Sequence, residues 1–63
     1  MKNKTRKSLR AAISAIAAYP HRDSIRAAAH RRWGHAMRQF LRGDLAEAYQ
    51  LSQSILEDLG ERR

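Results

Sequence analysis

Residues 40–49 read Phe-Leu-Arg-Gly-Asp-Leu-Ala-Glu-Ala-Tyr, and the Gly-Asp pair at their centre separates two helical patterns. Gly43 suits the left-handed backbone position that closes a helix, and Asp44 is a favourable N-cap for the next one. Glu47, three residues after Asp44, completes a pattern similar to a capping box, with Asp in place of the usual Ser or Thr. The segment therefore predicts that one helix ends near residue 42 and another begins near residue 45.

A second break lies at Tyr19-Pro20, because proline disfavours helix in the residue before it. Asp23 or Ser24 can cap the segment that follows. No β pattern competes, since the 63 residues include no Val and one Thr, and Ala supplies much of the apolar content. We therefore predict an all-α fold, a single small domain over residues 1–63. Its helices are expected over about 5–18, 23–42 and 45–59, after a disordered basic leader of residues 1–4.

Each predicted helix carries an apolar face at the spacing of about 100° per residue. On the first helix that face holds Leu9, Ile13 and Ile16, and on the second Ile25, Ala29, Trp33, Ala36, Met37 and Phe40. Trp33 is therefore predicted to be a core anchor. The face of the third helix, from Leu45 to Leu59, is broader than one partner helix covers. We expect the second and third helices to form a hairpin, with the first helix packed on it and a second chain completing the core.

Charge is divided unevenly along the chain. Residues 1–42 contain eleven of the 13 Lys and Arg and one of the six Asp and Glu, for a net charge of +10, whereas residues 43–63 carry −3. A basic segment of this kind suits a polyanion, such as DNA, RNA or an acidic protein surface. The imbalance therefore points to the kind of partner that the protein binds.

The strongest basic feature is a row at helical spacing on the second helix, away from its apolar face: Arg31, His35, Arg38 and Arg42. Further basic candidates flank this row or lie on the first helix: Arg32, Lys7 and Arg10. The planar fork of arginine matches the geometry of phosphate and carboxylate groups. We predict that these seven residues bind nucleic acid or an acidic partner, and a merely solvated helix face is the plain alternative.

The sequence contains no motif that predicts catalysis or metal binding. The chain has no Cys, and His30 and His35 are five residues apart, so they point away from each other on a helix. No Gly-rich phosphate loop appears, and the acidic residues are not gathered for general acid-base work. The protein is expected to be no enzyme, to hold no metal and to use no cofactor.

Membrane association is not expected either. The apolar stretch over residues 11–19 is too short to span a bilayer, and the basic leader is not followed by a signal-peptide core. A membrane-surface helix is permitted by Lys7 and Arg10 but resisted by the acidic third helix. The expected location is the cytoplasm.

One local resemblance supports the hairpin. Residues 43–49, followed by Ser52 and Ile55-Leu56, resemble the turn and second helix of a tetratricopeptide repeat, in which a Gly-Asp turn precedes a helix with a small packed Ala. Gly43 and Ala48 match that pattern once, over about a dozen residues, whereas a repeat array needs about three units. The resemblance implies an antiparallel pair of helices over residues 24–59. It does not imply a peptide-binding array.

A DNA-reading helix-turn-helix is the competing motif. Its second helix should contact base edges, yet the helix after Gly43 carries Glu47, Glu57 and Asp58. The function predicted first is therefore that of a small basic regulatory protein, of the kind carried by bacteria, phages or plasmids, that binds nucleic acid through its Arg-rich helix. Lys2, Lys4 and Arg6 would add phosphate contacts. The alternative is an adaptor or inhibitor that docks on an acidic surface of a partner, such as a nucleic-acid-processing enzyme.

Overall fold

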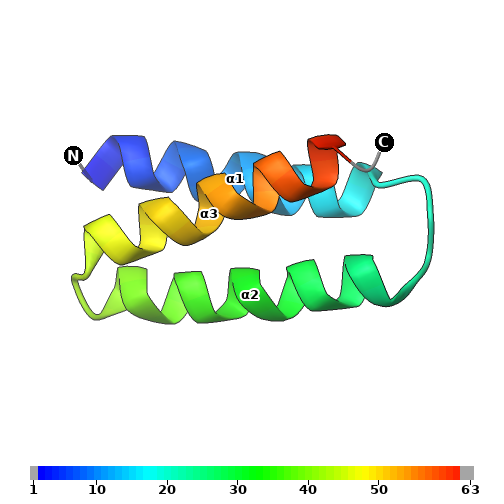
Figure 1. The fold of residues 1–63 in the computed structure, drawn as a ribbon. Helices are drawn as coiled ribbons and strands as arrows, with labels where there is room; N and C mark the ends of the chain where they lie inside the picture. Colours follow the sequence, from blue (N-terminus) through cyan, green and yellow to red (C-terminus); the bar gives the residue numbers. More distant parts are fainter. Residues whose placement is uncertain (1, 62–63) are drawn as a thin grey trace.

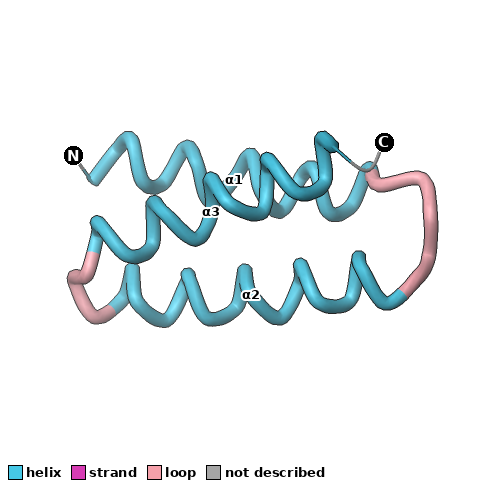
Figure 2. Tube along the Cα trace, in the orientation of Figure 1, coloured by secondary structure: helices cyan, strands magenta, loops and turns pink. Residues whose placement is uncertain are grey.

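Three helices make up the computed structural model, which describes residues 2–61: α1 (Lys2–Ala18), α2 (Ser24–Leu41) and α3 (Leu45–Glu61). These residues contain no strand, so the predicted all-α class with three helices is confirmed. The helices lie side by side in a compact bundle, in which α2 runs back along α1 and α3 runs back along α2 (Figure 1). The two connections lie at opposite ends of the bundle (Figure 2).

The first helix is longer than the sequence predicts. It begins at Lys2, so the leader expected to be disordered is helical over residues 2–4, and Met1 lies outside the described residues. The reason is that no Gly or Pro occurs before Pro20 to stop a helix from extending towards the N-terminus.

The other helix ends follow from side-chain and backbone capping. Asp23 caps α2, since its Oδ1 accepts hydrogen bonds from the backbone N–H groups of Ile25 (3.1 Å) and Arg26 (3.2 Å). At the far end of α2, Gly43 has a φ of +92°. Its N–H donates to the carbonyl of Phe40 (3.1 Å), and the N–H of Asp44 donates to the carbonyl of Gln39 (2.9 Å). This Schellman arrangement ends α2, and Asp44 in turn caps α3 by accepting from the N–H of Glu47 (3.2 Å).

The core lies between the three helices, and α3 packs extensively against both α1 and α2. Its central cluster is small and well buried, and consists of Ala12, Ile16, Tyr19, Ala29, Ile55 and Leu59. Trp33 packs against this cluster, as predicted, and its indole Nε1 donates to the carbonyl of Leu9 (2.9 Å). The broad apolar face of α3 is therefore covered on two sides within one chain.

A polar contact that the sequence analysis does not anticipate joins α1 to α3. Ser8 and Ser52 are buried and hydrogen-bond to each other, and Gln53 Nε2 donates to Ser8 Oγ (2.8 Å). Ser52 also donates to the carbonyl of Tyr49 (2.8 Å). Because a buried hydroxyl without a partner is costly, this network favours one axial alignment of α1 against α3. It therefore contributes to the uniqueness of the bundle.

Two glycines of the same fold give opposite expectations. Gly43→Ala places a side chain at a left-handed φ and is expected to lower the free energy of unfolding by about 1–2 kcal/mol. Gly34 has ordinary helical geometry within α2, and a methyl group there would meet no described atom within 4 Å beyond its own turn. Gly34→Ala is therefore expected to raise the free energy by about 0.5–1 kcal/mol. Urea unfolding followed by circular dichroism measures both, and equal effects at the two positions would contradict this description of the turn.

Candidate functional site

The basic row predicted on α2, Arg31, His35, Arg38 and Arg42, is exposed to solvent at every position. Ala29 and Ala36, which are buried, mark the opposite side of the same helix. Within residues 2–61 no carboxylate forms an ion pair with this row. The row therefore presents unneutralised positive charge along the outer edge of the bundle.

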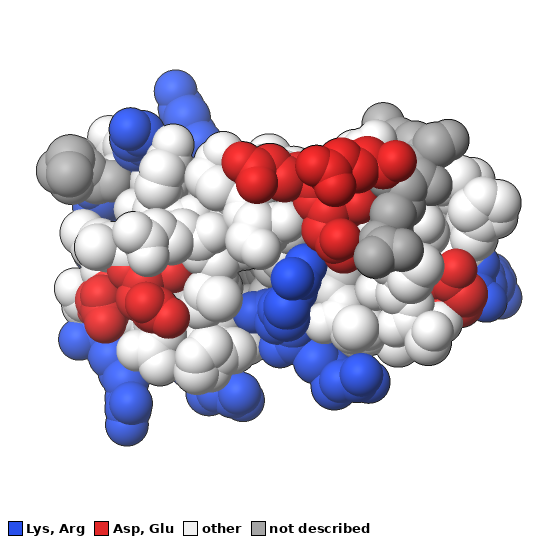
Figure 3. Space-filling model, viewed as in Figure 1, with Lys and Arg blue, Asp and Glu red and all other residues white. Residues whose placement is uncertain are grey.

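Acidic residues gather elsewhere. In the view of Figure 3, Asp and Glu cover part of the surface of α3, while Lys and Arg side chains project along the edge formed by α2. Glu47, Glu57, Asp58 and Glu61 all belong to α3. The division of charge seen along the sequence is thus largely a division in space, since four of the six Asp and Glu lie on α3, while Asp23 and Asp44 cap the N-termini of α2 and α3.

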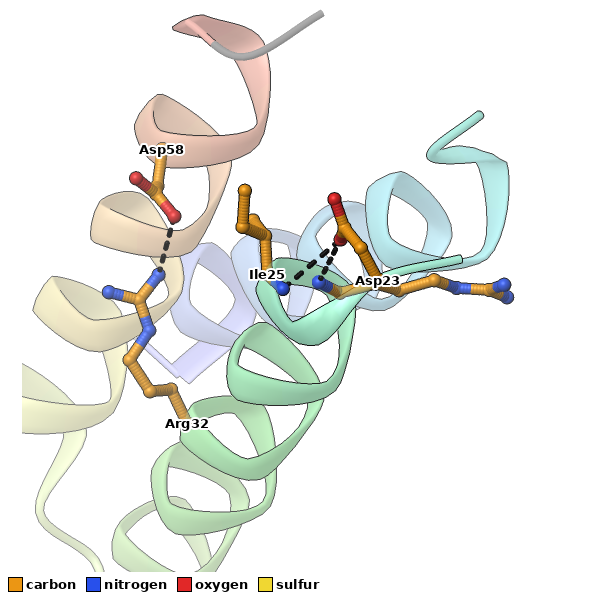
Figure 4. Close-up of polar contacts among 5 residues, drawn as sticks. Asp23, Ile25, Arg32 and Asp58 are labelled. Carbon is orange, nitrogen blue, oxygen red and sulfur yellow. Dashed lines mark hydrogen bonds and ion pairs between the residues drawn. The ribbon is translucent and has the colours of Figure 1, made fainter. Parts of the chain in front are cut away.

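The side chain of Arg32 points towards α3 and not along the row, although Arg31, its neighbour in the sequence, belongs to the row. The Arg32 side chain is 39% exposed and reaches α3, where one Nη lies 3.6 Å from Asp58 Oδ2 (Figure 4). Its Nε is buried without a hydrogen-bond partner among the described residues. Arg32 therefore bridges α2 and α3, and it contributes less free charge than the sequence spacing indicates.

The α1 candidates Lys7 and Arg10 are both exposed, but they differ in their surroundings. Arg10 and Arg6 line a groove of about 230 Å³ between α1 and α2, and Lys7 does not. Lys4 lies on another side of α1, where its Nζ is 4.7 Å from the centre of the Tyr49 ring of α3. The basic residues of α1 thus do not form one patch.

Two arginines that the sequence analysis did not include lie at the N-terminal end of α2. Arg22 and Arg26 line an open depression of about 630 Å³, whose other polar lining residues are Asp23, His30 and Arg31. The guanidinium of Arg26 is held in place because its Nε donates to the carbonyl of Ile16 (3.0 Å). Arg26 and His30 are four residues apart on α2, which was the available signal, whereas Arg22 lies in the connection before α2 and Asp23 lies between the two arginines.

The three histidines are exposed. His21 packs edge-on against Tyr19, with ring centres 5.7 Å apart, and His30 lies 6.3 Å from the Trp33 ring. Over residues 2–61, no group of three or more His, Asp or Glu side chains is placed to hold a metal ion. In the same part of the chain, no helix combines the length and the apolar character needed to cross a bilayer.

No family model, curated protein or solved structure matches this chain.

Proposed function

We propose that the protein is a small, non-enzymatic, cytoplasmic regulatory protein that binds nucleic acid through the α2 row. The observation that supports this most is the exposed series Arg31, Arg38 and Arg42, with His35 between them, which forms no ion pair with a carboxylate of residues 2–61. These residues lie on one edge of a rigid helix, so their positions relative to one another are fixed before binding. Fixed cations lose less conformational freedom on binding than those of a disordered tail.

The dimensions of the row suit a phosphate backbone. From Arg31 to Arg42 the helix rises about 16 Å, a length over which a duplex carries roughly nine phosphate charges. Each of the three guanidinium groups along that length can bind one phosphate group, because the arginine side chain can donate two parallel hydrogen bonds to it.

Such contacts give affinity with little sequence preference, because they involve the backbone and not base edges. A protein of this kind regulates by covering a stretch of nucleic acid or by holding it within a complex. The acidic α3 would be repelled by phosphate. It therefore keeps the α2 edge, and not the other sides of the bundle, against the polyanion.

The alternative function, docking on an acidic protein surface, has one observation in its favour. Leu41 is 76% exposed, and it lines a surface depression with His35, Arg38, Gln39 and Arg42. An exposed apolar side chain among cations is typical of a protein contact more than of a phosphate contact. In that case Leu41→Ala would weaken partner binding by more than about tenfold, whereas binding of a single copy to a short duplex should be nearly unchanged.

The helical hairpin and the homo-oligomer are also part of the proposal. We propose that α2 and α3, joined by the turn at Gly43, form the hairpin unit that presents the row, and that two copies associate when bound. Leu41 offers apolar contact area between copies, while Arg38 and Arg42 beside it would repel each other until phosphates neutralise them. Sedimentation with and without duplex DNA measures this directly, and a monomer in both conditions would contradict it.

The experiment that tests the function is a binding titration with a generic DNA duplex and with single-stranded RNA at about 50 and 200 mM salt. Three arginine–phosphate contacts alone predict a slope of log affinity against log salt of about −2.7, so the affinity for a duplex should fall about 40-fold between the two conditions. The polymer that binds more tightly identifies the natural class of ligand. Absence of binding at the lower salt, or a change below about threefold, would contradict the proposal.

A further inference from the structure

The groove between α1 and α2 is separate from the α2 row and has a different chemistry. Its floor is apolar and its lining includes two cations, in this order along the chain: Arg6, Leu9, Arg10, Ile13, Trp33, Met37 and Phe40. Among these described lining residues, none is acidic and none belongs to α3. The groove measures about 230 Å³ and runs along the part of the bundle where the contact between helices is smallest.

The floor is preorganised. Trp33 is partly buried, and its Nε1–H is already satisfied by the carbonyl of Leu9 at 2.9 Å, so the indole ring offers apolar surface without an unpaired donor. Met37 and Phe40 are also partly buried and continue this surface along α2. Aromatic and methionine side chains that are fixed but still accessible are typical of sites that bind an apolar anchor.

We propose that this groove docks an acidic amphipathic helix of a partner protein. Such a helix would place apolar side chains on Trp33 and Met37 and carboxylates beside Arg6 and Arg10. Residues 6–13 span about two helical turns, which matches anchors at positions i, i+4 and i+7 of a docked helix. The four-residue spacing of Arg6 and Arg10 matches carboxylates four residues apart on the partner.

Charge complementarity selects this occupant over the others. The apolar floor provides no free donor or acceptor for a base edge, which disfavours nucleic acid. A second copy would present Leu41, its exposed large apolar side chain among the described residues, surrounded by Arg38 and Arg42. That would bring cations against Arg6 and Arg10. An acidic helix meets both the apolar floor and the cationic rim.

The test uses Trp33 as its own reporter, since it is the only tryptophan of the chain. The probe is a synthetic amphipathic helix of about 14 residues, with Leu at i, i+4 and i+7 and Glu spaced four apart beside them. The expected result is a saturable change in Trp33 emission. A control peptide with Gln in place of Glu should bind about tenfold more weakly.

Adjacent residues of α1 supply a matched pair of variants. Arg6→Glu reverses a charge in the lining of the groove and should weaken binding of the acidic peptide about tenfold. Lys7→Glu makes the same charge change one residue later, at an exposed position that does not line the groove, and should change binding less than threefold. Circular dichroism establishes that each variant is folded, and the two peptides test the unmodified chain in any case.

Three results would overturn the inference. Equal binding of the Glu and Gln peptides would show that the cationic rim plays no part. Equal loss in the Arg6 and Lys7 variants would show that only net charge matters. A change in Trp33 emission caused by a DNA duplex, but not by the acidic peptide, would assign the groove to nucleic acid. The outcome is independent of the proposed function, because that function rests on α2 residues outside the groove.

Discussion

Ile55→Ala is expected to lower the free energy of unfolding by about 3 kcal/mol, because Ile55 is fully buried at the centre of the core cluster. A domain of this size rarely has more than about 3–5 kcal/mol of stability, so the variant should be largely unfolded at 37 °C. The same core cluster contains two small residues, Ala12 and Ala29, which have few atoms with which to refill a cavity. Urea unfolding monitored by circular dichroism gives the value.

Leu41→Ala is the matched control, since it removes a similar side chain from a position that is 76% exposed. Its expected effect lies within about 0.5 kcal/mol of zero. If both variants lose the same stability, the core is not where the structure places it. If Ile55→Ala loses less than about 1 kcal/mol, the packing around Ile55 is looser than its burial indicates.

Removal of three arginines from the α2 row should nearly abolish nucleic-acid binding. In the triple variant Arg31→Ala, Arg38→Ala and Arg42→Ala, each lost contact removes about 0.9 from the salt slope. At about 0.1 M salt this corresponds to roughly eightfold per contact, or about 500-fold in total. Fluorescence anisotropy with a labelled duplex measures both the affinity and the slope. The fold should persist, because all three side chains are exposed.

A second triple variant controls for net charge. Ala46→Glu, Gln50→Glu and Ser54→Glu change the total charge by the same amount, but at exposed positions on α3. They should weaken binding only severalfold, since charges more than a Debye length from the bound phosphates are largely screened. Equal losses in the two triple variants would mean that net charge alone, and not the α2 row, attracts the polyanion.

Local chemistry explains which parts of the fold were predictable. Pro20 and the Gly43-Asp44 pair act on their own neighbours, and the helices around them end within one or two residues of the predicted bounds. The positive φ of Gly43 was likewise predictable from residue type and spacing, whereas the sequence left the N-cap of α2 open between Asp23 and Ser24, and the structure shows it to be Asp23. The prediction placed the start of α1 near residue 5, three residues too late. No Gly or Pro among residues 2–4 prevents the helix from beginning at Lys2.

Contacts between helices were not predictable in the same way. Ser8 lies well to one side of the apolar face predicted for the first helix, so its burial against Ser52 depends on the rotation and axial alignment of α1 against α3. The ion pair of Arg32 with Asp58 depends in the same way on how α2 lies against α3. These contacts decide which basic residues stay free, so the sequence located the α2 row but could not separate Arg32 from it.

The groove lined by Arg6 and Trp33 was also hidden from the sequence, because it forms only where α1 and α2 face each other. The sequence presents Arg10 only as a basic candidate of the first helix. In the bundle Arg6 and Arg10 line the same groove as Trp33, Met37 and Phe40 of α2.

The most direct test of the α2 row is an NMR titration of isotopically labelled protein with a short DNA duplex at about 50 mM salt, a condition that favours phosphate contacts. It follows the backbone amides of α1, α2 and α3 together with the guanidinium Nε–H signals. We predict that the shifts concentrate at Arg31, Arg38 and Arg42, and that the amides of Glu57 and Asp58 on α3 remain unchanged. Shifts centred on α3, or on the groove residues Trp33 and Met37 with the row unaffected, would contradict the account.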